Sequence, residues 1–277
     1  MTTTAITPSQ IPGSTRLSRI AQVLKGLVLS PRWLFLIVFI LLWNTYAVHR
    51  QSRLIPTPLK VATTMWKILV SGEFFNQLAA SMTRILIGFS LAMLVGIIIG
   101  ILMGSRKSFD QFFKALVIMG LALPGLIYAL ICVMFFGISM LAPVTAILAG
   151  SYPFVVVNVA EGVKSLDKDL IDMGRAYKVG RGKIVRQVIL PSLLPFILAA
   201  IRNGFAVAWK ICTLVEVFGA VSGVGYMIKS SFDQYAVFGI IAWALLFGGV
   251  MLVIEYGLLV PAERYLARWR PKVKQVV

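Results

Sequence analysis

Six long apolar runs, separated by polar segments, constrain this 277-residue chain more than any other feature. The runs cover residues 33–48, 78–103, 112–136, 140–159, 193–218 and 236–260. A helix needs about 20 mostly apolar residues to cross the roughly 30 Å hydrocarbon layer of a bilayer. The chain is therefore predicted to be an all-α, polytopic membrane protein with about six transmembrane helices. The composition agrees, because 59% of the residues are hydrophobic and only 13% are charged.

The net charge of +17 is distributed unevenly between the segments that join the predicted spans. With the N-terminus in the cytoplasm, nineteen Lys and Arg residues fall in cytoplasmic segments and five in outer segments. Cytoplasmic loops of membrane proteins carry such an excess, so both termini are predicted to be cytoplasmic. We expect a cytoplasmic N-terminal segment (1–32), a transmembrane domain (33–262) with a cytoplasmic loop at 161–191, and a basic cytoplasmic tail (263–277). Membrane lipid is the expected surrounding, and the apolar content argues against nucleic-acid binding.

Catalytic and metal-binding chemistry are not predicted. Cys132 and Cys212 both lie inside apolar runs, and the single His49 cannot build a His-rich metal site. No GxxxxGK[ST] motif occurs, so the chain is not expected to hydrolyse ATP by that route or to bind a cofactor. A membrane-embedded enzyme is disfavoured for the same reasons.

The second run carries a small residue at every fourth position: Gly88, Ala92, Gly96, Gly100 and Gly104. Small residues at this spacing allow two helix backbones to approach closely in lipid. The pattern predicts a compact bundle of packed helices.

Four ionisable residues inside the predicted spans stand out: Arg84, Arg202, Lys210 and Glu216. Such residues are costly in lipid and are candidates for function. Arg84 and Glu216 also admit a second interpretation, in which they lie near the outer boundary and extend to the headgroups. Lys210 lies further inside its run and must face a cavity or a partner helix. Pro124-Gly125 interrupts the third run, and broken helices of this kind commonly line translocation paths.

The longest polar stretch, 161–191, carries its own apolar residues. Leu166, Leu170, Met173 and Tyr177, followed by Ile184, Val188 and Ile189, suggest two short amphipathic helices broken around Gly180-Arg181-Gly182. This loop is expected to bind a protein partner. The alternative is that both helices lie on an anionic membrane surface.

The chain resembles the permease subunits of bacterial binding-protein-dependent ABC importers with the type I fold, and within them the nitrate/sulfonate/taurine group. The family's cytoplasmic loop ends in Ile-x-Leu-Pro, and here the ending is Val188-Ile189-Leu190-Pro191. Asp172-Met173-Gly174 stands where the family has Glu-Ala-Ala, and Lys178 stands where it has Gly. These departures suggest a docking turn shifted towards Gly180 and Gly182, or a pair of unequal permeases.

Other matches extend the resemblance over roughly residues 40–270. They are Ile55-Pro56-Thr57-Pro58, Ser81-x-x-Arg84-x-x-x-Gly88-Phe89-x-x-Ala92, Phe135-Phe136-Gly137-Ile138 and Val215-Glu216-x-x-Gly219-x-x-x-Gly223-x-Gly225-Tyr226. The stretch Ala122–Tyr128 departs from the proline-rich run of the sulfonate-type members.

The resemblance implies a bacterial inner-membrane importer. In such an importer, two permeases, either identical or different, enclose a path. Two ATPase subunits bind ATP and Mg and dock on the cytoplasmic side of the permeases. A periplasmic or lipid-anchored solute-binding protein delivers the solute. The implied ATPase-coupling residues are Asp172, Met173, Gly174, Ala176, Lys178, Gly180, Ile189, Leu190 and Pro191. The candidates for the translocation path are Pro124, Tyr128, Arg202, Lys210 and Glu216. The candidates for a periplasmic gate are Gly219, Gly223 and Gly225.

The charges inside the spans favour an anionic solute. Three cations, Arg84, Arg202 and Lys210, stand against Glu216 and Glu255. An organic or inorganic anion such as a sulfonate is therefore expected. An uncharged or aromatic/heterocyclic nutrient remains open, as does an ion-coupled secondary transporter, although no inverted repeat is recognisable.

Overall fold

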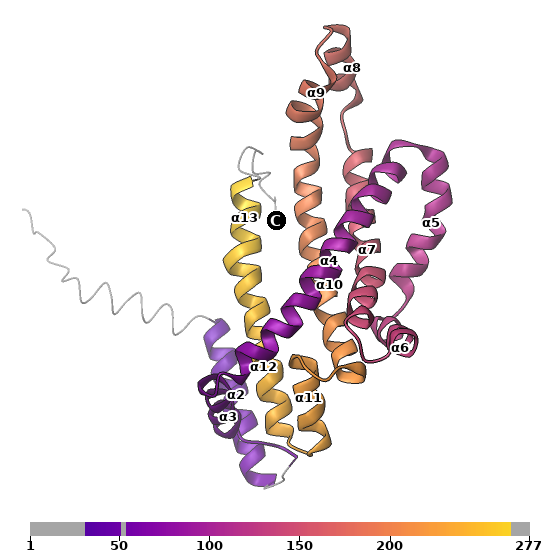
Figure 1. Ribbon diagram of the computed structural model, residues 1–277. Coiled ribbons are helices and arrows are strands. Elements are labelled where there is room, and N and C mark those ends of the chain that lie inside the picture. Colours follow the sequence, from indigo (N-terminus) through magenta and orange to yellow (C-terminus); the bar gives the residue numbers. More distant parts are fainter. Residues whose placement is uncertain (1–30, 51–53, 267–277) are drawn as a thin grey trace, which may run out of the picture. The chain divides into compact units, whose positions relative to one another are not determined.

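The computed structural model describes residues 31–50 and 54–266, and every regular element in these two ranges is helical (Figure 1). Most of the predicted N-terminal segment 1–32 lies outside the described residues, as does the predicted tail beyond residue 266. The chain divides into two compact units between residues 60 and 61. Each unit is described by itself.

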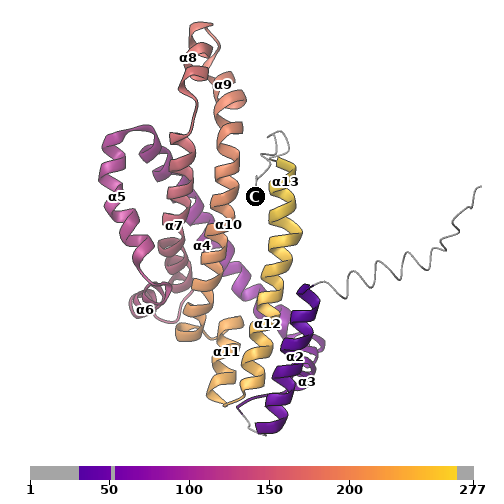
Figure 2. The same cartoon turned by 180° about the vertical axis from the view of Figure 1, so that it is seen from behind.

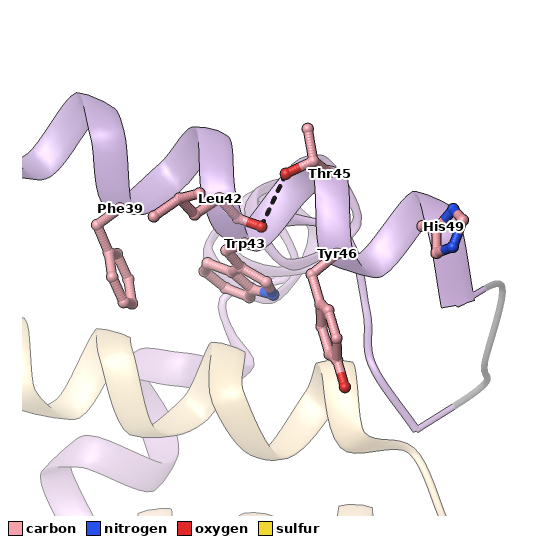
Figure 3. Close-up of a pocket in the computed structure, with 6 residues that line it drawn as sticks. All are labelled: Phe39, Leu42, Trp43, Thr45, Tyr46 and His49. Atoms are coloured by element: carbon pink, nitrogen blue, oxygen red, sulfur yellow. Dashed lines mark hydrogen bonds between the residues drawn. The ribbon is translucent and has the colours of Figure 1, made fainter.

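The first unit contains helix α2 (Pro31–Arg50), which corresponds to the first predicted span. Its apolar part, Leu34–Arg50, is shorter than the other membrane-length helices. A shallow hollow of about 860 Å³ runs along its aromatic face, between Phe39 and His49 (Figure 3). The Thr45 hydroxyl in this hollow donates to the Leu41 and Leu42 carbonyl oxygens of its own helix, at 2.8 and 3.0 Å. The hollow is therefore mainly apolar surface, as expected for a helix in lipid.

The second unit contains the other predicted spans. Its helices are α3 (Pro58–Val70, beginning in the first unit), α4 (Glu73–Ser105), α5 (Lys107–Ala122), α6 (Gly125–Phe136), α7 (Leu141–Lys164), α8 (Lys168–Ala176), α9 (Arg181–Ile184), α10 (Leu190–Gly219), α11 (Val224–Asp233), α12 (Val237–Ile254) and α13 (Val260–Leu266). Two π-helical segments, η1 (Val185–Ile189) and η2 (Glu255–Leu259), join α9 to α10 and α12 to α13.

Four continuous helical stretches in the described residues are long and apolar enough to cross a membrane. They are Glu73–Ser105, Leu141–Lys164, Arg181–Gly219 and Val237–Leu266, and they contain four of the predicted spans. The remaining predicted span, 112–136, is the pair α5 and α6, which is bent by 96°. The interruption predicted at Pro124-Gly125 is confirmed. The helices α3 and α11 were not predicted, because each is shorter than a span.

The stripe of small residues on α4 packs against α7. A Cβ atom added to Gly96 would lie 2.6 Å from the Cβ of Val155, and one added to Gly100 would lie 2.7 Å from the Cβ of Val159. The two helices are thus so close that only glycine fits at these positions. The predicted close approach of two helices is confirmed as packing within one chain.

Aromatic side chains fill the core where α4, α10 and α12 meet. The ring centroids of Phe89 and Phe205 are 5.6 Å apart, and those of Trp209 and Phe247 are 3.9 Å apart with nearly parallel planes. Phe205 and Trp209 lie one turn apart on α10, so a single helix face supplies both. This packing fixes the rotation of α10 and so decides which of its residues face away from the core.

Candidate functional site

The break between α5 and α6 follows from the missing N–H of Pro124. In a continuous helix that N–H would donate to the carbonyl oxygen of Gly120, so the proline frees this acceptor. The Tyr128 hydroxyl takes its place and donates to the Gly120 oxygen at 2.9 Å. Tyr128 is thus a side chain that holds the bend, and the broken backbone is satisfied within the protein.

A cavity of about 220 Å³ lies beside this break, between α5, α6, α7 and α10. Tyr128 and Lys210 both line it, together with Gly120, Gly125 and Gly150. The rest of its wall is apolar, formed by Leu121, Leu123, Phe154, Val207, Ile211 and Leu214. The structure thus brings together two of the path residues predicted from the sequence, and Pro124 adjoins the cavity through Gly125.

Arg202 and Glu216, the other two predicted path residues, do not line this cavity. Arg202 of α10 forms an ion pair with Glu255, with 2.5 Å between its Nε and the carboxylate, and lies 3.8 Å from Glu263. It therefore joins α10 to the segment from η2 to α13. Its partners could not be chosen from the sequence, because no periodicity relates α10 to the last span.

Glu216 lies at the centre of a buried polar network. Its carboxylate accepts hydrogen bonds from Arg84 at 2.6 Å, from the Ser81 hydroxyl at 2.8 Å and from the Gly225 N–H at 2.9 Å. The Cys212 thiol lies 3.5 Å away. Only 1% of Glu216 is exposed. The interpretation that Arg84 and Glu216 extend to the headgroups is therefore wrong: they satisfy each other inside the protein.

The same network holds the loop between α10 and α11 against α4. Arg84 also donates to the Ser222 carbonyl oxygen at 2.7 Å and to its hydroxyl at 2.8 Å. The Gly223 N–H donates to Gln77 at 2.7 Å, and the Val224 N–H donates to Ser81 at 2.9 Å. Ser81 and Arg84 belong to the second-span motif noted in the sequence, whereas nothing there indicated that Gln77, one turn earlier, is their neighbour.

The glycines predicted as gate residues are packed closely in this structure. Gly223 has a φ of 107°, and an added side chain would collide with the Glu216 carboxylate. A Cβ on Gly225 would lie 2.6 Å from the Glu216 Cβ, and one on Gly219 would lie 2.6 Å from a methyl of Val133. The described geometry therefore requires glycine at 223 and 225 so that the loop can approach the network, and at 219 so that α10 can pack against α6.

Helices α8 and α9 project beyond the turn between α4 and α5, at the end of α10 opposite α11 (Figures 1 and 2). The helix α8 carries the predicted coupling residues Asp172, Met173, Gly174 and Ala176. Its apolar residues Leu170 and Met173 are exposed, as is Tyr177, which directly follows the helix. A cavity of about 560 Å³ lies between α8, α9 and η1, with apolar walls and the side chains of Arg175 and Arg181.

The turn after α8 has a left-handed residue at Lys178, with a φ of 54°. The Val179 N–H donates to the Gly174 oxygen and the Lys178 N–H to the Arg175 oxygen, both at 2.9 Å. This pattern is the Schellman motif, which ordinarily has glycine at the left-handed position. The turn is therefore at the position where the family has Gly, and not at Gly180, whose φ is −57°.

The second helix of this loop differs from the prediction. It begins at Arg181, so Gly182 is inside the helix, and it continues through η1 and α10 to Gly219 as one stretch of 39 residues. Ile189 ends η1, and Leu190 and Pro191 open α10. Pro191 lacks an N–H, and the π-helical segment immediately before it changes the hydrogen-bond register without ending the helix.

The fold and these sites define a multi-pass membrane protein with a projecting helical loop. Residues 92–261 match the family described as binding-protein-dependent transport system inner membrane component. The chain belongs to this family, and it is the permease component of an ABC importer.

Relatives and solved structures agree with this class. The Bacillus subtilis permease protein SsuC, provisionally named for aliphatic sulfonates transport, is 29% identical over 79% of this chain and 79% of its own length. The taurine transport system permease protein TauC of Escherichia coli is 27% identical over 86% of this chain and 89% of its own. The bicarbonate transport system permease protein CmpB of Synechococcus elongatus is 26% identical over 78% of this chain and 82% of its own.

Among solved structures, an amino acid ABC transporter shares the fold with a TM-score of 0.56 and 23% identity, over 72% of this chain and 96% of its own. The inward-facing MetNI methionine ABC transporter shares it with a TM-score of 0.55 and 19% identity, over 68% of this chain and 91% of its own.

Proposed function

We propose that this chain forms half of the translocation path of an ATP-driven importer for a small anion in the bacterial inner membrane. Two copies, or this chain and a different permease, enclose the path. Two ATPase subunits bind ATP and Mg and hydrolyse the ATP on the cytoplasmic side. A periplasmic or lipid-anchored solute-binding protein delivers the solute from the other side. The sulfonates and bicarbonate named for two of the relatives are the class of solute that we expect.

The observation that carries this proposal is the continuity of the helical stretch Arg181–Gly219. At a rise of about 1.5 Å per residue, 39 residues extend roughly 58 Å. One end of this stretch lines the 560 Å³ cavity beside α8, which we call the groove. Further along, Lys210 lines the 220 Å³ cavity, and Glu216 near the other end holds the loop to α11. Movement imposed at the groove therefore reaches both the cavity and the loop.

The groove supports docking of an ATPase over adsorption to lipid. Its apolar walls can receive an apolar side chain from a partner, and Arg175 and Arg181 can meet acidic groups around it. The segment from Arg181 to Ile189 forms one wall of the groove and extends about 14 Å beyond the start of α10. Closure of the ATPase pair would draw the two grooves together and open the cavity outward, and hydrolysis would reset it.

Co-purification tests the proposal. Val185→Asp places a charge in the groove wall, where the wild-type side chain is about half exposed. We expect this variant, like the double variant Leu190→Asp with Pro191→Ala, to lose the co-purified ATPase and ATP-dependent uptake. The matched control is Phe232→Asp, which changes an exposed apolar residue at the far end of the second unit. This variant should retain both the co-purified ATPase and the uptake. A wild-type chain that never associates with an ATPase would contradict the proposal.

A further inference from the structure

Both acidic residues inside the spans form ion pairs with arginine side chains. Glu216 pairs with Arg84, and Glu255 pairs with Arg202. The other eight acids of the chain lie at or near helix ends, and all of them belong to the described residues: Glu73, Asp110, Glu161, Asp167, Asp169, Asp172, Asp233 and Glu263. Two of the three span cations are therefore neutralised within the chain.

Lys210 is the third span cation, and neither of these two acids pairs with it. Its side chain is exposed and lines the 220 Å³ cavity. Among the residues that the structure describes it forms no ion pair and no hydrogen bond through its ammonium group. It lies nine residues before the end of α10, which is roughly 14 Å along the helix axis. An unpaired ammonium at such a depth is costly and requires a compensating anion or water.

A second copy of the chain cannot supply the missing negative charge. A twofold axis along the membrane normal places each residue of one copy at the same depth as its equivalent. The partner would therefore present its own Lys210 at this depth, while its Glu216 is as deeply buried and as fully bonded as in the first copy. In a pair of identical permeases, the compensating charge therefore has to come from a molecule that enters the cavity.

We infer that Lys210 and this cavity form an anion-binding site within the permease itself, selective for a small solute with one negative charge and no cationic group. The inference rests on the proposed function, in which the cavity is part of the path. The ammonium of Lys210 attracts the charge, and the apolar wall around Phe154, Val207 and Leu214 receives the remainder of the solute. None of the described residues that line the cavity carries a carboxylate, so the ammonium group of a zwitterion would lose its water without gaining a partner.

Ethanesulfonate and taurine are matched probes, because taurine adds only an ammonium group to the same sulfonate. Binding is measured by calorimetry on the full chain in lipid nanodiscs. We expect the dissociation constant of ethanesulfonate to be lower than that of taurine by about tenfold or more. Lys210→Met should raise the dissociation constant of ethanesulfonate by a similar factor. Lys210→Arg should retain binding. Lys229→Met, which removes a lysine already paired with Asp233 at 2.7 Å, should leave binding unchanged.

A second variant tests the charge after folding is complete. Cys132 and Cys212 are buried, so Lys210→Cys introduces a cysteine that is much more accessible than either. Its reaction with aminoethyl methanethiosulfonate restores a cation at this position, whereas the sulfonatoethyl reagent adds an anion. Recovery of ethanesulfonate binding with the first reagent alone supports the inference.

Three results would overturn it: equal binding of ethanesulfonate by wild type and Lys210→Met, equal binding of taurine and ethanesulfonate, or no binding of either by the wild type or by its complex with a second permease. Because docking of the ATPase is measured separately by co-purification, each of these results would leave the importer function standing. Loss of the ATPase association would not change the calorimetric result.

Discussion

Arg84 of α4 and Glu216 of α10 form a buried ion pair, 2.6 Å between the guanidinium and the carboxylate, although they are 132 positions apart in the chain. Their side chains are 12% and 0% exposed. The pair fixes α10 to α4 and, through Ser222 and Gly225, the loop that leads to α11. These elements should therefore move together with α10, relative to the bent pair α5 and α6 on the other side of the cavity.

Breaking the pair on one side should destabilise the protein strongly. Arg84→Met leaves the Glu216 carboxylate buried without its cation, which costs about 3–5 kcal/mol. The free energy of unfolding, measured by denaturation in mixed micelles, should fall by that amount. The double variant Arg84→Met with Glu216→Gln should be more stable than Arg84→Met alone, because no charge then remains buried. Equal or lower stability of the double variant would contradict the pairing, and Lys229→Met is the exposed control.

Tyr128→Phe should loosen the bend between α5 and α6. The substitution removes the hydroxyl that donates to Gly120, and an unsatisfied buried carbonyl costs about 1–3 kcal/mol. We expect reduced stability and faster hydrogen exchange in residues 119–128, measured by mass spectrometry. Tyr152→Phe is the matched control, because the described structure gives the Tyr152 hydroxyl no hydrogen bond. Equal effects of the two substitutions would show that the bend does not depend on this bond.

Lys178→Gly should stabilise the end of α8. A residue with a Cβ in the left-handed region costs about 1–2 kcal/mol, and the greater freedom of glycine in the unfolded chain offsets part of this gain. We expect slower hydrogen exchange in α8 in the Gly variant. Lys178→Ala, which removes the same charge but keeps the Cβ, should show no such slowing. Similar protection in both variants would mean that charge, and not backbone conformation, governs this turn.

Gly96→Ala should force α4 and α7 apart. The new methyl would lie 2.6 Å from the Val155 Cβ, and overpacking of this kind costs about 1–3 kcal/mol. The free energy of unfolding should fall by this amount, and adding Val155→Ala should recover much of the lost stability. Gly248→Ala in α12 is the control, since an added Cβ there meets no atom within 4 Å. A Gly96 variant as stable as the Gly248 variant would contradict the close packing.

Apolar runs and small residues made the helices, and a close helix contact on the small-residue face of α4, predictable, although not that α7 is the partner. Lengths of about 20 apolar residues identify spans, and glycine at every fourth position identifies a close helix contact. The missing N–H of Pro124 likewise predicted the break, and with it the region of the cavity. These signals are local, since each depends on residues within one helix.

Pairings between distant helices were not predictable. Which of Arg84, Arg202 and Lys210 would meet Glu216 or Glu255 depends on the rotation and depth of each helix, which are set by core packing such as that of Trp209 on Phe247. For the same reason the sequence grouped Arg202 and Glu216 with the path residues, whereas the structure places both in ion pairs away from the cavity. The left-handed turn at Lys178 was missed because lysine gives no local signal for it.

The most direct test of the coupling between groove and cavity is the modification rate of Lys210→Cys in proteoliposomes that contain the assembled permease–ATPase complex. The rate of reaction with aminoethyl methanethiosulfonate is measured with and without a non-hydrolysable ATP analogue. We predict that the analogue changes this rate severalfold, and that Val185→Asp in the groove abolishes the change. A rate that is the same with and without the nucleotide, in a complex that retains its ATPase, would contradict the proposed coupling.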